Sequence, residues 1–316
     1  KLRYNIVDLD IVRKEIFPIY DNLLKDTEQE VKSIAILKTE EILDKLTTEQ
    51  LENDIIPAFS MLAVDPSLHV RISVASIISK LSAYLSVDSL IKTLLPLIQT
   101  LLKDEVVEVK IAAIQNLSPY NEKIGPENVE KHILPLIMST VHEKQWRCRL
   151  SVIERLPDVC KSLGYDTFKN QLAEFVFGFA VDHYYLIREA TLDNANKLIE
   201  IFGWNKMKDI IKNMFDNLIN NTNYLFRLTA ISGFSKLYKN LDKSTYDEVL
   251  GDIVEKFLTD KVPNVRFNTI KFLIGFKSEL SSSFVRFKII PKLENLRTDP
   301  DPDVSYYAKS ALEKFK

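Results

Sequence analysis

The sequence predicts an all-α solenoid, a row of helical hairpins stacked one against the next, and three observations support this prediction. The chain of 316 residues repeats with a period of 39 residues, a length typical of helical repeat proteins. Apolar residues within each period follow the 3.6-residue spacing of an amphipathic helix. Glycine is scarce, with 7 residues in the whole chain, which disfavours glycine-rich phosphate loops and long β-hairpin arrays.

The repeat is defined by a six-residue spacing across a turn. An acidic residue or Asn is followed after four residues by an apolar residue and then, in all copies but the last, by Lys or Arg. The first residues of the eight copies, each 39 residues after the previous one, are Asp26, Asp65, Asp104, Glu143, Asp182, Asn221, Asp260 and Asp299. The basic residues that end the first seven copies are Lys32, Arg71, Lys110, Arg149, Arg188, Arg227 and Arg266.

Each repeat is predicted to contain two helices on either side of this turn. In the third repeat, residues 88–103 place Leu94, Ile98 and Leu101 on one face of a first helix, and residues 109–118 form the second helix. A proline recurs within the first helix, where the loss of a backbone donor is expected to kink it. These prolines are Pro18, Pro57, Pro96, Pro135 and Pro291.

The repeats are predicted to form a single solenoid over residues 1–316, because a lone hairpin cannot bury its own apolar stripe. Their ranges are 8–46, 47–85, 86–124, 125–163, 164–202, 203–241, 242–280 and 281–316. Each range starts with a residue type that is favoured or tolerated as a helix N-cap. These residues are Asp8, Thr47, Ser86, Gly125, Gly164, Gly203, Asp242 and Ser281.

The two ends of the row differ in character. The last repeat ends with Lys309, Glu313 and Lys314, a polar surface suited to terminate a solenoid. The first helix, in contrast, is rich in Ile, Leu, Phe and Tyr, with no repeat before it to cover that surface. We therefore expect the chain to be the C-terminal piece of a longer array.

Charge and cysteine content disfavour several classes of protein. Lys and Arg number 42 and Asp and Glu 44, so a net charge of −2 gives no general attraction for nucleic acid or an anionic membrane. No stretch of 18 apolar residues occurs, and residues 1–20 lack the pattern of a signal peptide. Cys148 and Cys160 are too few for a disulfide framework, which favours a reducing compartment. A cytoplasmic location is expected, with the nucleus as an alternative.

No catalytic, metal or cofactor motif is found in the sequence. HExxH, CxxC, P-loop, Rossmann and G-x-S-x-G patterns are absent, as are the phosphatase metal motifs GDxHG, GDxxDRG and GNHE. The histidines, His69, His132, His142 and His183, do not cluster with other metal ligands in the sequence. We therefore predict a chain that is not an enzyme and takes no cofactor, metal ion or small-molecule substrate.

Turn residues are the candidates for function. The recurring arginines have a structural interpretation, in which each pairs with the carboxylate of a neighbouring turn. Trp146 and Arg147 lie outside the recurring positions, and an aromatic–Arg pair on an exposed turn is typical of an interface hot spot. Tyr185 and Tyr224 occupy equivalent turn positions and suit a binding surface. For all four residues, packing between adjacent turns is the alternative.

The paired helices, the proline in the first helix and the six-residue acid–Arg spacing resemble HEAT repeats. Their uninterrupted 39-residue register is similar to the scaffold (A, structural) subunit family of protein phosphatase 2A. The matching segments include KQWRCRL at 144–150, DHYYLIREAT at 182–191, NYLFRL at 223–228 and NVRFN at 264–268. That family has fifteen repeats, so the eight repeats would correspond to its C-terminal half.

The resemblance implies which residues contact a partner. In that family the catalytic subunit docks on the turns of the last five repeats, which correspond to the fourth to eighth repeats of this chain. The implied contacts are Trp146, Arg147, Tyr185, Tyr224, Arg227, Val262 and Arg266. No contact is implied in the eighth repeat, where Ser305 replaces the basic residue. Regulatory B-type subunits of the family bind mostly to earlier repeats, so the resemblance implies that all but a boundary repeat of their docking surface is missing here.

The expected function is a non-catalytic scaffold. It would bind the catalytic subunit of a phosphatase 2A-type Ser/Thr phosphatase and position it relative to regulatory subunits, which raises their effective concentration. The alternative is an importin- or adaptor-like transport or coat protein. Such proteins usually have repeats of variable length and an acidic inner face, so the constant repeat length and near-neutral charge favour the scaffold.

Overall fold

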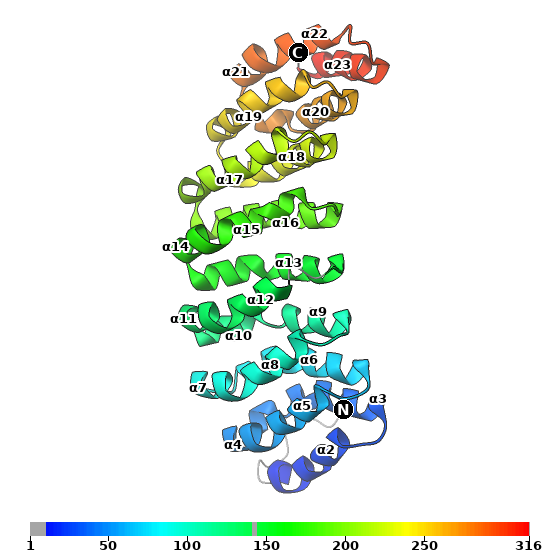
Figure 1. Ribbon diagram of the computed structural model, residues 1–316. Coiled ribbons are helices and arrows are strands. Elements are labelled where there is room, and N and C mark those ends of the chain that lie inside the picture. The colour runs from blue at the N-terminus through cyan, green and yellow to red at the C-terminus, as the bar shows by residue number, and fades with distance from the viewer. Residues whose placement is uncertain (1–10, 141–143, 316) are drawn as a thin grey trace. The chain divides into compact units, whose positions relative to one another are not determined.

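The computed structural model describes residues 11–140 and 144–315, and this part of the chain contains helices and no strand (Figure 1). The all-α prediction is therefore confirmed. The predicted first N-cap Asp8, the acidic residue Glu143 and His142 lie outside the described residues. The chain divides into two compact parts, residues 1–168 and 169–316, which we call the N-terminal part and the C-terminal part.

The N-terminal part consists of helix pairs. The first helix of each pair is made of two or three segments. In the first repeat these are η2 Val12–Ile16 and α2 Phe17–Leu24, and in the second α4 Thr48–Gln50, η5 Leu51–Ile55 and α5 Ile56–Leu62. In the third they are α7 Val87–Ser89, η6 Leu90–Leu94 and α8 Leu95–Leu102, and in the fourth α11 Pro126–Asn128, η7 Val129–Ile133 and α12 Leu134–Thr140. Its second helices are α3 Gln29–Lys38, α6 Leu68–Ser82, α9 Val107–Gln115 with α10 Ser118–Ile124, and α13 Trp146–Leu163. Two 3-10 turns, η3 Thr39–Glu41 and η4 Leu43–Lys45, follow α3.

The boundary between the two parts falls in the first helix of the fifth repeat, which begins with α14 Tyr165–Thr167 in the N-terminal part and η8 Phe168–Leu172 across the boundary. The further first-helix segments are α15 Ala173–Gly178, α17 Trp204–Ile219, α19 Lys243–Leu258, and α21 Ser282–Phe284 with η12 Val285–Ile289 and α22 Ile290–Leu296. The second helices are α16 Tyr185–Phe202, α18 Tyr224–Leu237, α20 Pro263–Gly275 and α23 Pro302–Phe315. The 3-10 turns are η9 Phe179–Val181, η10 Tyr238–Asn240 and η11 Lys277–Glu279.

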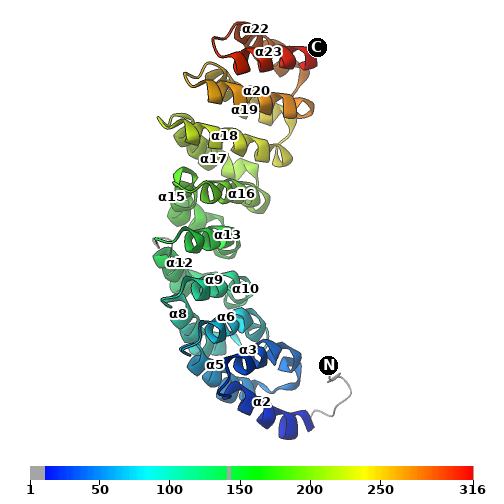
Figure 2. The ribbon, with the colours of Figure 1, turned by 90° about the vertical axis from the view of Figure 1, so that its right-hand side faces the viewer.

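Within each part the second helices lie side by side in chain order, α3, α6, α9 and α13 in one part and α16, α18, α20 and α23 in the other (Figure 2). The apolar position ten residues after each turn residue faces this packing. It is buried at Ile36, Ala75, Ile114, Ile153, Leu192, Ile231 and Ile270. In the last repeat the same position is Lys309, which is exposed. Cys148 and Cys160 are both buried.

Helix starts agree with the predicted N-caps wherever the structure describes them. Thr47, Ser86, Gly125, Gly164, Gly203, Asp242 and Ser281 all are N-cap residues. Thr47 forms a capping box with Gln50, in which each side chain bonds the backbone N–H of the other residue. Gly203 has φ of 85°, a backbone conformation that residues with a Cβ rarely adopt.

A wider helical turn precedes each of the recurring prolines of the first helices. A five-residue π-helical turn ends two residues before Pro18, Pro57, Pro96, Pro135 and Pro291. Each proline then lies in the first turn of the next α-helical segment, where a missing N–H donor breaks no bond. The proline-free helices α17 and α19 are continuous. The fifth repeat is an exception, because η8 forms before Glu174 without a proline.

Among the described residues, no helix combines enough length with enough apolar character to cross a bilayer.

Candidate partner-binding turns

The recurring acidic and basic residues form an ion-pair ladder between consecutive turns, as their spacing predicts. Arg227 donates from Nε and Nη2 to the two carboxylate oxygens of Asp260, at 2.6 and 2.9 Å. Arg266 binds Asp299 in the same way, at 2.9 and 2.7 Å. All described pairs join residues 33 positions apart: Lys32–Asp65, Arg71–Asp104, Arg227–Asp260 and Arg266–Asp299.

Each ladder arginine also fixes the turn of its own repeat. Arg266 donates from Nη1 to the backbone carbonyl of Asp260, six residues earlier, at 2.6 Å. The Asp260 carboxylate accepts the N–H of Val262, two residues later, at 2.8 Å. Asp260 is thus held by the arginine of its own repeat through its carbonyl and by the arginine of the preceding repeat through its side chain. This double use explains the six-residue spacing in the sequence.

The ladder is interrupted between α16 and α18, because Asn221 stands in the acidic position. Its Oδ1 still accepts the N–H of Asn223, at 2.9 Å, so the turn keeps its shape. The rest of the amide group is an NH2 donor, which cannot accept a hydrogen bond from a guanidinium group. Arg188, 33 positions earlier, donates instead from Nε to Thr229 Oγ1, at 2.9 Å.

Arg188 is buried beside two aromatic rings, and the carboxylates of Asp182 and Glu189 lie near enough to act on its charge. It is 6% exposed, and its Cζ lies 5.6 Å from the ring centroid of Tyr185 and 5.5 Å from that of Phe226. Nη1 donates to the backbone carbonyl of Asp182 at 2.9 Å. Burial lowers the pKa of the guanidinium, although the Asp182 and Glu189 carboxylates oppose that effect. The charge of Arg188 is therefore buried without the carboxylate that the ladder supplies to Arg227 and Arg266.

Exposed aromatic and apolar side chains gather on the same two turns. Tyr185 and Tyr224 are the first residues of α16 and α18, and they are 55% and 36% exposed. Three neighbours that the sequence pattern did not single out are exposed as well. We call the whole set the aromatic patch: Tyr184, Tyr185, Leu186, Tyr224 and Leu225. Clustered exposed apolar groups mark interaction surfaces.

Neighbouring polar groups restrict the orientation of the Tyr185 side chain. Partial burial and the adjacent carboxylate of Glu189 raise the pKa of its hydroxyl. Glu189 in turn forms an ion pair with Lys236 of α18, at 2.9 Å, and accepts from Ser232 at 2.8 Å. A tyrosine held in one orientation loses little conformational entropy when a partner covers it.

In the N-terminal part, Trp146 and Arg147 begin α13. Trp146 is half-buried and Arg147 is exposed, with its Cζ 5.5 Å from the indole centroid. The pair thus forms a cation–π contact at the start of a second helix. Its binding role stays a prediction.

The other implied contacts lie within the ladder. Arg227 and Arg266 are engaged in its ion pairs, so the structural interpretation of the two arginines is confirmed. Val262 is the half-buried N-cap residue of α20. Whether these three residues contact a partner stays a prediction.

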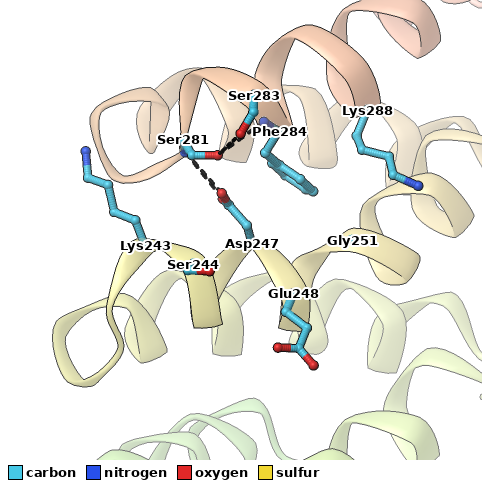
Figure 3. Close-up of a pocket in the computed structure, with 9 residues that line it drawn as sticks. All are labelled: Lys243, Ser244, Asp247, Glu248, Gly251, Ser281, Ser283, Phe284 and Lys288. Carbon is cyan, nitrogen blue, oxygen red and sulfur yellow. Dashed lines mark hydrogen bonds between the residues drawn. The ribbon is translucent and has the colours of Figure 1, made fainter.

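Two further features of the described residues concern metal ligands and a surface groove. No group of three or more His, Cys, Asp or Glu in this portion is arranged to hold a metal ion. An open groove between α19 and α21 is lined by residues that include Glu248, Gly251 and Lys288 (Figure 3). At its end, Asp247 accepts the N–H of Ser281 at 3.3 Å. Its lining charges have both signs, so the groove shows no preference for an anion or a cation.

Sequence comparison finds phosphatase subunits among the relatives of the chain. The regulatory A subunit of protein phosphatase PP2A from Saccharomyces cerevisiae is 30% identical over 97 residues, which are 28% of this chain and 15% of that protein. The beta isoform of the 65 kDa regulatory A subunit of Homo sapiens serine/threonine-protein phosphatase 2A is 36% identical over 72 residues, 22% of this chain and 12% of that protein. The aligned stretch is therefore a small share of either relative.

Among solved structures, the karyopherin Kap121p bound to the SUMO protease Ulp1p superimposes with a TM-score of 0.72. The match covers 99% of this chain and 34% of the karyopherin, at 14% sequence identity. Kap121p bound to the extreme C-terminus of the phosphatase Cdc14p gives the same TM-score at 15% identity. At such low identity the likeness shows a shared helical-repeat fold alone.

Two family models match the chain and together cover most of it. The PPP2R1A-like HEAT repeat model matches residues 10–86, which agrees with the phosphatase subunits found by sequence. The model of the PIK3R4-like middle domain matches residues 83–263, a relationship that the sequence motifs did not predict. The chain is therefore a HEAT-repeat protein that belongs to the PIK3R4-like middle-domain family over more than half of its length and is related to the regulatory A subunits of protein phosphatase 2A.

Proposed function

We propose that the chain is a non-catalytic scaffold that binds the catalytic subunit of a phosphatase 2A-type Ser/Thr phosphatase through the turns before its second helices. The observation that carries this proposal is the aromatic patch, which lies on two consecutive turns of the C-terminal part. Its five side chains are between 36% and 55% exposed. The relationship to regulatory A subunits indicates the class of partner.

The ion-pair ladder suits this role because it fixes each turn relative to the next. A partner that spans two turns then meets side chains whose spacing is already set, so little ordering entropy is lost on binding. Tyrosine supplies large contact area and a hydroxyl donor at low entropic cost. Binding would hold the enzyme near regulatory subunits on the same scaffold and so raise their effective concentration.

Trp146 and Arg147 form a second proposed contact, in the N-terminal part. Aromatic and arginine side chains are enriched among residues that dominate binding energy. Arg227, Val262 and Arg266 would add contacts at the rim of the patch, with the two arginines serving the ladder first. A transport or adaptor role of the karyopherin type is the alternative, and its support is the shared fold.

The test is binding of the purified chain to a purified phosphatase 2A catalytic subunit, measured by calorimetry. Tyr185→Ala/Tyr224→Ala and Trp146→Ala/Arg147→Glu should each weaken binding by about tenfold or more, as expected for hot-spot residues. Tyr306→Ala is the matched control, because Tyr306 is also an exposed tyrosine, 66% accessible, and lies within α23 rather than in a turn. Circular dichroism would show that all variants keep their helices.

Failure of the unmodified chain to bind would refute the phosphatase proposal. Binding that survives the tyrosine variant, but not the tryptophan variant, would move the main contact to the N-terminal part. Equal loss in the Tyr306→Ala control would show that the effect is not specific to the turns.

A further inference from the structure

A second group of exposed apolar side chains lies on the turn of the second repeat, in the N-terminal part. Met61 near the end of α5, Val64 in the turn and Leu68 at the start of α6 are 75%, 67% and 37% exposed. The Val64 N–H donates to the Met61 carbonyl at 3.3 Å, so these two residues belong to one tight turn. We call the three residues the Met61 cluster.

The fold does not require apolar residues at these positions. The residues equivalent to Met61 in the seven other repeats are polar or glycine: Asn22, Thr100, Ser139, Gly178, Asn217, Lys256 and Asn295. Val64 also occupies a position that is polar in six of the seven other repeats, and Leu68 is equivalent to Tyr185 and Tyr224 of the aromatic patch. Exposed apolar residues that packing does not explain mark interaction surfaces.

The turns on either side of the Met61 cluster are acidic. Helices α3, α6 and α9 lie side by side (Figure 2), and Ser67 Oγ of the second turn donates to Gln29 Oε1 of the first turn at 2.5 Å. Arg71 ties the third turn to the second through Asp104, at 2.6 Å. Close to Gln29 and Asp104 in the sequence are four exposed glutamates: Glu28, Glu30, Glu105 and Glu108. The first and third turns therefore place carboxylates on both sides of the cluster.

The four glutamates carry negative charge that their surroundings do not neutralise. The ladder acids of these turns are paired, Asp65 with Lys32 and Asp104 with Arg71. Within the described part of the chain, by contrast, none of the four glutamates forms an ion pair with a basic side chain. Lys103, exposed on the third turn, offsets one of these charges. A net negative charge therefore remains beside the apolar side chains.

We propose that the Met61 cluster binds a protein segment in which apolar side chains are flanked on both sides by Lys or Arg. Neighbouring helices pack about 8–10 Å apart, so the first and third turns are separated by about 16–20 Å. About six residues of extended chain span that distance. The apolar side chains of the segment cover the cluster, and its basic residues reach the glutamates on either side. Such charge complementarity favours basic partners and disfavours acidic ones.

The test measures binding of the full chain to a fluorescent synthetic peptide, with Lys at both ends and Leu and Val between them, by fluorescence anisotropy. Met61→Asn/Val64→Thr/Leu68→Gln introduces residue types that other repeats carry at the equivalent positions, so the fold should tolerate the change. The variant should bind the peptide about tenfold or more weakly, as expected for loss of a central apolar contact. Phe287→Ser is the matched control, because Phe287 is 70% exposed in the C-terminal part, and it should leave the affinity unchanged. Circular dichroism would show that both variants keep their helices.

A second pair of measurements tests the charges. Glu28→Gln/Glu105→Gln removes one carboxylate on either side of the cluster, so it should weaken binding and make binding less sensitive to salt. A peptide with Glu in place of Lys should bind the unmodified chain about tenfold or more weakly than the Lys peptide, because like charges then face each other.

Three results would overturn the inference. Failure of the unmodified chain to bind the Lys peptide would show that this surface takes no basic apolar segment. Equal binding of the Lys and Glu peptides would show that charge has no part in recognition. Undiminished binding by Met61→Asn/Val64→Thr/Leu68→Gln would place the peptide elsewhere on the chain. None of these outcomes bears on the phosphatase proposal, whose test uses a different partner.

Discussion

Replacing Asn221 by Asp should restore the missing ion pair of the ladder and stabilise the chain. In Asn221→Asp, the new carboxylate would take the place that Asp260 has opposite Arg227, where the two bonds are 2.6 and 2.9 Å long. Hydrogen bonds that involve charged groups contribute roughly 1.5–3 kcal/mol each, and the neutral Arg188–Thr229 bond that would be given up contributes about 1 kcal/mol.

These bond contributions are already net of the hydration lost at a typical site, so burial of the new carboxylate offsets only part of the gain. We expect the free energy of unfolding to rise by about 1–2 kcal/mol. Asp260→Asn is the reciprocal change, and it should lower that free energy by roughly 3 kcal/mol, because it leaves Arg227, only 5% exposed, without its carboxylate.

Urea unfolding followed by circular dichroism would measure both variants. Repeat proteins can unfold in segments, so hydrogen exchange of α16 and α18 should be measured as well. Asn221→Asp should slow exchange in these two helices. Thr229→Val completes a double-mutant cycle, since loss of the hydroxyl should matter less once position 221 carries a carboxylate. An Asn221→Asp chain that unfolds at the same or a lower urea concentration would refute the argument that the neutral bond is a weaker substitute for the ion pair.

Three further predictions concern packing and ionisation. Gly233→Ala should lower the free energy of unfolding by about 1–3 kcal/mol, because the new Cβ would lie 2.8 Å from Phe215 Cζ. Gly251→Ala should raise it by about 0.5–1 kcal/mol, because the atom nearest to its new Cβ is 3.8 Å away. Equal urea midpoints for the two variants would contradict this contrast. Burial raises the pKa of Cys160 from 9.0 to about 12, so a thiol reagent at pH 8 should label it only after unfolding, and stability should decline as the pH rises above 9.0 and the unfolded thiol ionises. The Thr245 N–H holds the pKa of Asp242 below its usual 3.8, so the stability from this cap is present above that pH and is lost as the pH falls below it; acid unfolding of Asp242→Asn should lack this component.

The recurring features of the fold could be predicted because equivalent positions carry the same kind of residue in successive repeats. The buried position at Ile36 and its equivalents follows from helical periodicity, and the ladder follows from the six-residue spacing between acid and base. The π turns were not predicted. A proline shows that one backbone donor is lost, but it does not show whether the helix bends or widens, and η8 widens without a proline next to it.

The site was predictable only in part. Tyr185 and Tyr224 could be selected because they occupy equivalent positions before arginines. The exposure of Tyr184, Leu186 and Leu225 depends on how each turn meets its neighbours, which the sequence pattern does not record. The substitution at Asn221 is visible in the sequence, but the alternative acceptor is Thr229, 41 residues from Arg188, and no spacing rule connects those two positions.

The constant span of the ladder also restricts how such a chain can change in length. Since each ion pair joins residues 33 positions apart and the repeat is 39 residues long, removal of residues 228–266 would bring Arg227 into register with Asp299. Removal of residues 189–227 would likewise bring Arg188 into register with Asp260, which would close the existing gap. Shortening or lengthening by whole repeats therefore preserves the contacts between turns, whereas an insertion of any other size would disrupt them. Genetic deletion or duplication can thus tailor the length of the array, but only in fixed increments.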